Sequence, residues 1–127
     1  MSSSLELVGF RLAGYPLVVE AGLVGQMQAP HAQALASALA NRQRLCAYLG
    51  LPAEAPAGRW HSLLLRSAAG PLACALDEPI ELFSASLEQL LPLPPLVRDC
   101  QRLPAVRAVL QRPEGLCLVL DPARLRL

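Results

Sequence analysis

The sequence predicts a mainly β domain with one central helix. Short segments in which apolar and polar residues alternate recur along most of the chain, and glycine or proline separates them. Between residues 31 and 49 the composition changes to alanine, leucine, glutamine and arginine, which favour helix. With 127 residues, the chain can form one domain with a modest core.

The first twenty-eight residues are predicted to form a β-meander. Residues 5–13, LELVGFRLA, alternate with a period of two that changes phase at Gly9, which predicts a strand with a bulge. Gly14 marks a turn, and residues 15–20, YPLVVE, predict a second strand with β-branched valines. Residues 21–28, AGLVGQMQ, predict a third strand, which two glycines weaken.

The predicted helix covers residues 31–49, HAQALASALANRQRLCAYL. Its apolar side chains recur at helical spacing and predict a single buried stripe, made of Leu35, Ala38, Leu39, Leu45, Cys46 and Leu49. A break is conceivable at Asn41. Gly50 is well placed as the residue that follows the helix, with Pro52 shortly after it.

Residues 59–67 and 72–76 predict a hairpin that turns at residues 69–70. The returning strand reaches the acidic pair Asp77 and Glu78, and residues 80–83 predict a further strand. Because adjacent residues of a strand point to opposite faces, these two carboxylates do not form a catalytic pair, and we expect them to solvate the end of a strand.

The last third of the chain predicts a proline-rich edge and a final hairpin. Pro92, Pro94 and Pro95 make a stiff segment, and residues 96–103 predict one or two helical turns. Residues 105–112 and 116–120 predict two strands around a Pro-Glu-Gly turn. Asp121 precedes a proline, which is typical of a capped short helix at the end of the chain.

Composition and charge exclude several classes of function. The net charge is +1, the positive charges are all arginines scattered along the chain, and only 4% of residues are aromatic, which argues against nucleic-acid binding. No uninterrupted apolar run reaches 18 residues and no basic segment opens the chain, so we expect neither a membrane span nor a signal peptide. The hydrophobic fraction of 54% predicts surplus apolar surface that a partner or a second copy would cover.

No constellation of residues indicates an enzyme, a cofactor site or a metal site. The four cysteines, at positions 46, 74, 100 and 117, are far apart, and zinc sites usually show closely spaced pairs. We therefore expect reduced thiols and a cytosolic protein. Metal binding that uses His31 or His61 is the less favoured alternative. The alternative is a small enzyme or ligand-binding barrel that uses His61, Asp77 or Cys100.

Several segments together resemble a known family. The run LACALDEPIELFSASLEQLLPLPP resembles the second half of CheW-like chemotaxis coupling proteins through Leu76, Asp77, Ser86, Glu88 and the prolines. The closing AVRAVLQRPEGLCLVLDPARL is similar to the final hairpin of that family, and the first strands are similar to its opening Phe-x-Leu-Gly-x-x-Tyr-x-Leu pattern.

The middle of the chain departs from this family. Family members carry an Asn-Leu-Arg-Gly turn and a Pro-Val-x-Asp-Leu strand, whereas this chain has the predicted helix there, and only RLCAYLGLP resembles the end of that part. The resemblance thus implies a short CheW-like protein that lacks the middle of the first barrel and is similar to accessory Frz-type paralogues.

The resemblance implies two linked SH3-like barrels, the first incomplete, in a single domain over residues 1–127. We expect a reduced first subdomain over residues 1–58 and a second over residues 59–127, with the helix filling the first barrel. An open barrel edge also makes a homo-oligomer or a purely self-assembling module a further alternative.

It also implies a non-enzymatic adaptor without cofactor, at receptor clusters. The expected partners are a methyl-accepting chemoreceptor and a CheA-type histidine kinase or another CheW-like protein, with the kinase contact weakened because the first barrel carries it in the family. We expect partner contacts at Val18, Glu20, Leu23, Val24, Leu82, Leu90 and Leu93.

Overall fold

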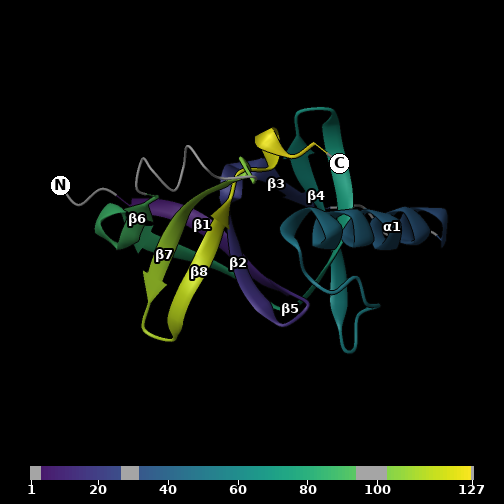
Figure 1. Ribbon diagram of the computed structural model, residues 1–127, viewed down its shortest axis with the longest axis horizontal. Helices are drawn as coiled ribbons and strands as arrows, with labels where there is room; N and C mark the ends of the chain where they lie inside the picture. The colour runs from purple at the N-terminus through teal and green to yellow at the C-terminus, as the bar shows by residue number, and fades with distance from the viewer. Residues whose placement is uncertain (1–3, 27–31, 94–102, 127) are drawn as a thin grey trace.

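The computed structural model describes residues 4–26, 32–93 and 103–126. Within them, eight strands form one sheet in the order β3-β4-β5-β1-β2-β8-β7-β6, and every pair is antiparallel except β2 with β8. Figure 1 shows β6, β7 and β8 on one side of the molecule and α1 with β4 on the other. The strands are β1 (Ser4–Leu12), β2 (Tyr15–Glu20), β3 (Val24–Gln26), β4 (Trp60–Ser67), β5 (Gly70–Ser86), β6 (Leu90–Pro92), β7 (Val106–Arg112) and β8 (Gly115–Leu120).

One α-helix, α1 (Ala32–Leu49), and three 3-10 helices complete the described residues. The 3-10 helices are η1 (Ala21–Leu23), η2 (Leu87–Gln89) and η3 (Pro122–Arg124). The predicted third strand was thus too long, because its first three residues turn in η1. Its last two residues lie outside the described residues, as do His31, Pro94, Pro95, Cys100 and nearly all of the predicted helical turns at residues 96–103.

Strand β5 runs through both halves of the sheet. We predicted two strands here, but the structure has one strand of 17 residues. Its first half pairs with β4 as far as Asp77, and it pairs with β1 from Asp77 to Ser86, with a register shift between the pairs Arg11–Asp77 and Gly9–Glu81. Pro79 lies at this register shift, between Asp77 and Glu81, and a bulge of this kind tolerates a residue without an N–H.

The bulge predicted at Gly9 directs β1 into two cores. The pairing of β1 with β5 shifts register between Gly9 and Arg11. Before the bulge Leu7 packs in a smaller core, and after it Phe10 and Leu12 pack in a larger one. The smaller core contains Leu7, Val18, Ala85, Leu110 and Cys117. The larger core contains Phe10, Leu12, Leu17, Val19, Leu45, Cys46, Leu65, Cys74, Leu76, Ala105, Val106, Leu120 and Leu125.

Helix α1 packs against β5 and closes the larger core. The predicted apolar stripe is confirmed at Ala38, Leu45 and Cys46, which are fully buried. The helix continues through Asn41 without a break, and the Asn41 side-chain amide donates a hydrogen bond of 2.7 Å to the carbonyl of Ala73 on β5. The residue expected to weaken the helix thus fastens it to the sheet.

A buried ion pair makes the second link between α1 and β5. Arg42 is 3% exposed and contacts both carboxylate oxygens of Asp77, at 2.8 and 2.9 Å. It also donates to the backbone carbonyls of Ala75, at 3.2 Å, and Glu54, at 3.3 Å. The expectation that Asp77 solvates a strand end was therefore wrong, because this carboxylate neutralises a buried guanidinium.

The ends of α1 and of the chain follow the predicted signals. Gly50 has φ +72 and follows the last residue of α1, and the amide of Leu51 donates to the carbonyl of Cys46 at 2.8 Å. Asp121 caps η3 through a hydrogen bond of 3.1 Å from the amide of Ala123, with Pro122 in the first turn. Both sites are local, so the sequence alone was enough to predict them.

The division of the chain at residue 58 stays a prediction. Strands β1 and β2 precede this residue and pair with β5 and β8, which follow it. Any two subdomains therefore share strands of the same sheet.

Candidate partner-binding groove

One groove brings together three of the residues predicted to contact a partner. It has a volume of about 430 Å³ and lies between the end of β2, η1, β6 and the β7–β8 hairpin. Glu20, Leu23 and Leu90 are the three predicted residues in its lining. The other lining residues are Pro92, Arg107, Ala108, Val119, Leu120 and Asp121.

Two short 3-10 helices position the groove residues. Helix η1 follows β2 directly, so the chain turns at Glu20 and brings Leu23 beside it. Helix η2 is held by a capping box, in which the Ser86 hydroxyl accepts from the amide of Glu88 at 3.2 Å and the Gln89 side chain accepts from the amide of Ser86 at 2.9 Å. Gln89 also donates to the carbonyl of Gln111 on β7, which fixes the start of β6 at Leu90.

The groove has an apolar lining and a charged rim. Arg107, whose side chain is 54% exposed, contacts Asp121 at 3.2 Å, and Asp121 also lies 3.8 Å from Arg124. Glu20 is exposed at the end of β2, where Val19 pairs with Leu120, the residue before Asp121. An apolar centre with a polar rim is the usual composition of a protein–protein interface, so the groove suits an amphipathic segment of a partner.

The remaining predicted contact residues lie elsewhere. The prediction for Val18 needs correction, because its side chain is 1% exposed in the smaller core. Strand β2 is buried on both faces, since Leu17 and Val19 pack in the larger core. Val24 is half-buried against the larger core. Leu82 is 69% exposed on β5, and Leu93 is half-buried after β6.

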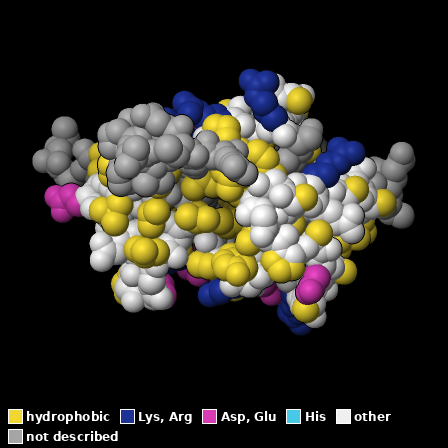
Figure 2. All heavy atoms as spheres, in the orientation of Figure 1, with side chains coloured by type: hydrophobic (Ala, Val, Ile, Leu, Met, Phe, Trp, Pro, Cys, Tyr) yellow, Lys and Arg dark blue, Asp and Glu magenta, His cyan; other side chains and the backbone are white. Residues whose placement is uncertain are grey.

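Sequence reasoning missed an exposed apolar row on β6, β7 and β8. Leu91 pairs with Val109, and Val109 pairs with Leu118, so the three share one face, together with Leu116 on β8. We call these four residues the apolar row; its leucines are 40 to 61% exposed. Figure 2 shows hydrophobic side chains over the area where Figure 1 places β7 and β8.

The opposite face of the same strands explains why the row was missed. Leu90 pairs with Leu110, and Leu110 pairs with Cys117, and this second set packs in or against the smaller core. Both faces of β8 are therefore apolar, and LCLVL contains no polar residue that would reveal the exposed face.

The candidate catalytic residues do not form a reaction centre. Asp77 and Glu78 diverge as predicted: Asp77 binds Arg42, and Glu78 contacts the Nε2 of His61 at 2.6 Å. The His61 side chain is 56% exposed, and no nucleophile is bonded to it in the described part of the chain. Cys100 lies outside the described residues.

The described cysteines are buried, free thiols, as their apolar surroundings predicted. Burial raises the pKa of the Cys74 thiol to about 12 and also raises the pKa of Cys46 and Cys117. Protonated thiols are poor nucleophiles and poor metal ligands. Residues 4–26, 32–93 and 103–126 contain no cluster of three histidine, cysteine or acidic residues that could hold a metal ion.

Within these ranges, no helix is both long and apolar enough to cross a membrane. No protein-family model matches the chain, and no curated protein matches it by sequence.

Among solved structures, the crystal structure of the scaffolding protein TtCheW from Thermoanaerobacter tengcongensis is similar, with a TM-score of 0.63 and 12% sequence identity. The match covers 93% of this chain and 89% of TtCheW. It confirms the predicted fold class, which is mainly β with one helix and CheW-like. The expected absence of part of the first barrel stays a prediction.

Proposed function

We propose that this protein is a non-enzymatic adaptor of a bacterial chemosensory or motility signalling array, and that it binds the cytoplasmic tips of chemoreceptors. The observation that carries the proposal is the CheW-like fold over 93% of the chain, shared with a protein described as a scaffold. The absence of a reaction centre from the described residues agrees with this role. The proposed location is the cytoplasm, at receptor clusters.

The receptor tip is proposed to bind in the groove beside Glu20, Leu23 and Leu90. Three features support this choice. The groove is apolar inside, it has acidic and basic groups at its rim, and it is wide enough for several side chains. An amphipathic helix would place its apolar stripe on Leu23 and Leu90 and its charged residues beside Glu20 and Arg107.

Binding of a CheA-type kinase is proposed to be weak. The support is the replacement of the family's Asn-Leu-Arg-Gly and Pro-Val-x-Asp-Leu segments by helix α1. The helix is fastened by Asn41 and Arg42 and covers part of the larger core. A kinase domain that docks on strands of the first barrel would meet a helix instead.

The apolar row supports a second candidate function, which is self-assembly. Three exposed leucines on β6 and β8, with Val109 of β7 between them, form a face that a second copy or another CheW-like protein could cover. A stable interface buries roughly 1,200–2,000 Å² in total, so this face would need neighbouring residues as well. Sedimentation velocity over a range of concentrations distinguishes this function from that of a monomeric adaptor.

Calorimetry tests the receptor proposal. The purified protein is titrated with the cytoplasmic hairpin of a cognate chemoreceptor and, separately, with the regulatory domain of the kinase. We expect binding to the receptor hairpin and weak or undetectable binding to the kinase domain. The variant Arg107→Glu should weaken receptor binding, whereas Arg44→Glu, on the exposed side of α1, should leave it unchanged. Failure to bind the receptor would refute the proposed function.

A further inference from the structure

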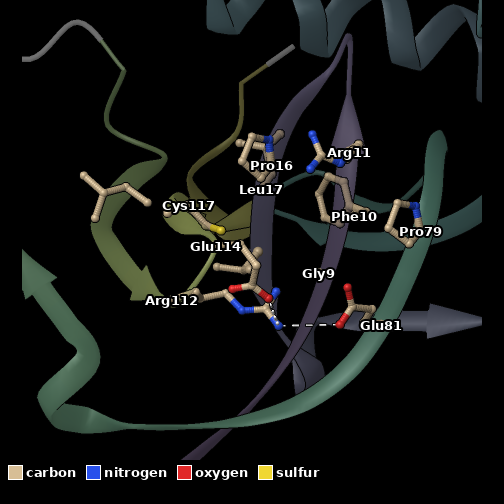
Figure 3. Close-up of a pocket in the computed structure, with 13 residues that line it drawn as sticks. Gly9, Phe10, Arg11, Pro16, Leu17, Pro79, Glu81, Arg112, Glu114 and Cys117 are labelled. Carbon is tan, nitrogen blue, oxygen red and sulfur yellow. Dashed lines mark hydrogen bonds and ion pairs between the residues drawn. The ribbon is translucent and has the colours of Figure 1, made fainter.

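A small cavity of about 120 Å³ lies beside the smaller core at the start of β2, whereas the groove lies at the end of that strand. Figure 3 shows that β1, β2, β5 and the β7–β8 turn surround it, with Arg112 facing Glu81 across the opening. Phe10, Leu17 and Val18 contribute apolar lining. A small concave site of this kind, with a few polar groups, is where binding sites occur in β-barrels.

The Arg112 side chain is mostly buried at this cavity. Its side chain is 19% exposed, and the guanidinium lies 4.0 Å from the centre of the Phe83 ring. Gly9 leaves room for this arrangement, because a Cβ there would lie 3.1 Å from the Phe83 ring and 3.8 Å from Nη1 of Arg112. The cation is therefore largely removed from water.

The guanidinium has spare capacity for hydrogen bonds. Only Nη2 contacts carboxylates, Glu81 and Glu114, each at 3.5 Å, whereas charge-assisted hydrogen bonds are usually about 2.7–2.9 Å long. Arg112 also donates a weak side-chain hydrogen bond to the sulfur of Cys117. Among the described residues, no oxygen atom accepts a hydrogen bond from Nε or Nη1 of Arg112.

We propose that this cavity binds one carboxylate, supplied by an acidic side chain of a partner protein, with Arg112 as its anchor. A carboxylate accepts two parallel bonds from an arginine, which neither glutamate makes here. The cavity, with a volume of about 120 Å³, is large enough for a single carboxylate group. Glu81 and Glu114 are 48% and 67% exposed, so both can turn to solvent when the carboxylate enters.

The assignment of the carboxylate to a protein partner rests on the proposed adaptor function. The carboxylate site itself rests on Arg112 alone. It would give the adaptor a second contact point, separate from the groove.

The test is a nuclear magnetic resonance titration of the full chain with the capped peptide acetyl-Gly-Glu-Gly-amide. We expect saturable shifts of the Arg112 Nε–Hε signal and of the Gly9 and Gly115 amides, with a dissociation constant on the order of 1–10 mM. The glutamine counterpart of the peptide should cause no shift. Arg112→Gln should abolish binding, and the matched control Arg44→Gln should not.

A second variant keeps the test decisive if Arg112→Gln disturbs the fold. Glu114→Gln removes a competing carboxylate from an exposed turn, so it should tighten binding of the glutamate peptide roughly two- to fivefold. Unchanged or weaker binding would overturn the proposal. Equal shifts with the glutamine peptide, or with inorganic phosphate, would also overturn it. Calorimetry with the receptor hairpin reports on the groove separately, so the two proposals fail independently.

Discussion

The link between Arg42 and Asp77 should be worth more to stability than any other ion pair between described residues. Its guanidinium is 3% exposed and makes two short contacts with the carboxylate, plus two with backbone carbonyls. Removal of one partner of a buried pair costs about 3–5 kcal/mol, because the other charge stays buried and unpaired. Since the Asp77 side chain is 19% exposed, we expect the lower end of that range, about 3 kcal/mol, for Asp77→Ala.

Urea unfolding followed by circular dichroism measures this cost. Arg42→Ala should lower the unfolding free energy by a similar amount, and Arg42→Lys by less, because lysine keeps the charge but loses the two-point contact. The exposed pair Arg107 and Asp121 is the control, and Arg107→Ala should cost about 0–1 kcal/mol. A loss below about 1 kcal/mol for both Arg42→Ala and Asp77→Ala would refute the claim that this pair fastens α1 to β5.

Three further predictions concern stability. Burial raises the pKa of Cys74 from 9.0 to about 12, so the folded state keeps its proton while the unfolded thiol ionises. The contribution of this pKa shift to the unfolding free energy is complete below about pH 9 and falls as pH rises towards 12. Between about pH 8 and 10, the wild type should lose about 1.4 kcal/mol more unfolding free energy than Cys74→Ala in urea melts. Gly50→Ala should cost about 1–2 kcal/mol in thermal unfolding because φ is +72, whereas Gly58→Ala, with no such angle, should cost little; equal costs would contradict this reasoning. Leu116 is 61% exposed, so Leu116→Lys should change the unfolding free energy by no more than about 0.5 kcal/mol. Leu110 is fully buried, so Leu110→Ala should cost about 2–5 kcal/mol. Similar costs for the two variants would mean that the apolar row is buried in the fold.

Local signals in the sequence predicted much of the fold. The phase change at Gly9, the helix with Gly50 after its end, and the cap at Asp121 each depend on residues within one or two turns. These elements formed as expected because neighbouring side chains and backbone groups determine them. The resemblance supplied the arrangement of the strands, which no local pattern contains.

Features that depend on distant pairing could not be predicted. Arg42 and Asp77 are 35 residues apart, and nothing in either segment indicates that the helix places one beside the other. The burial of Val18 follows from the position of β2 between β1 and β8, and the exposure of Leu116 and Leu118 follows from β8 being covered on one face only. In each case an apolar sequence was consistent with either face.

The groove brings together three of the predicted contact residues, whose role stays a prediction. Glu20, Leu23 and Leu90 come from segments almost seventy residues apart, and the structure places all three in one lining. These three residues were chosen through the resemblance. The ion pair of Arg107 and Asp121 at the rim was not predicted, because it joins β7 to the residue that follows β8.

The central claim is that a chemoreceptor tip docks in this groove. Its most direct test is amide chemical-shift mapping of the protein during titration with the receptor's cytoplasmic hairpin. We predict that the largest changes fall on Glu20, Leu23, Leu90 and Ala108, with little change along the exposed side of α1. Changes confined to the apolar row, or no changes at a saturating hairpin concentration, would contradict the account.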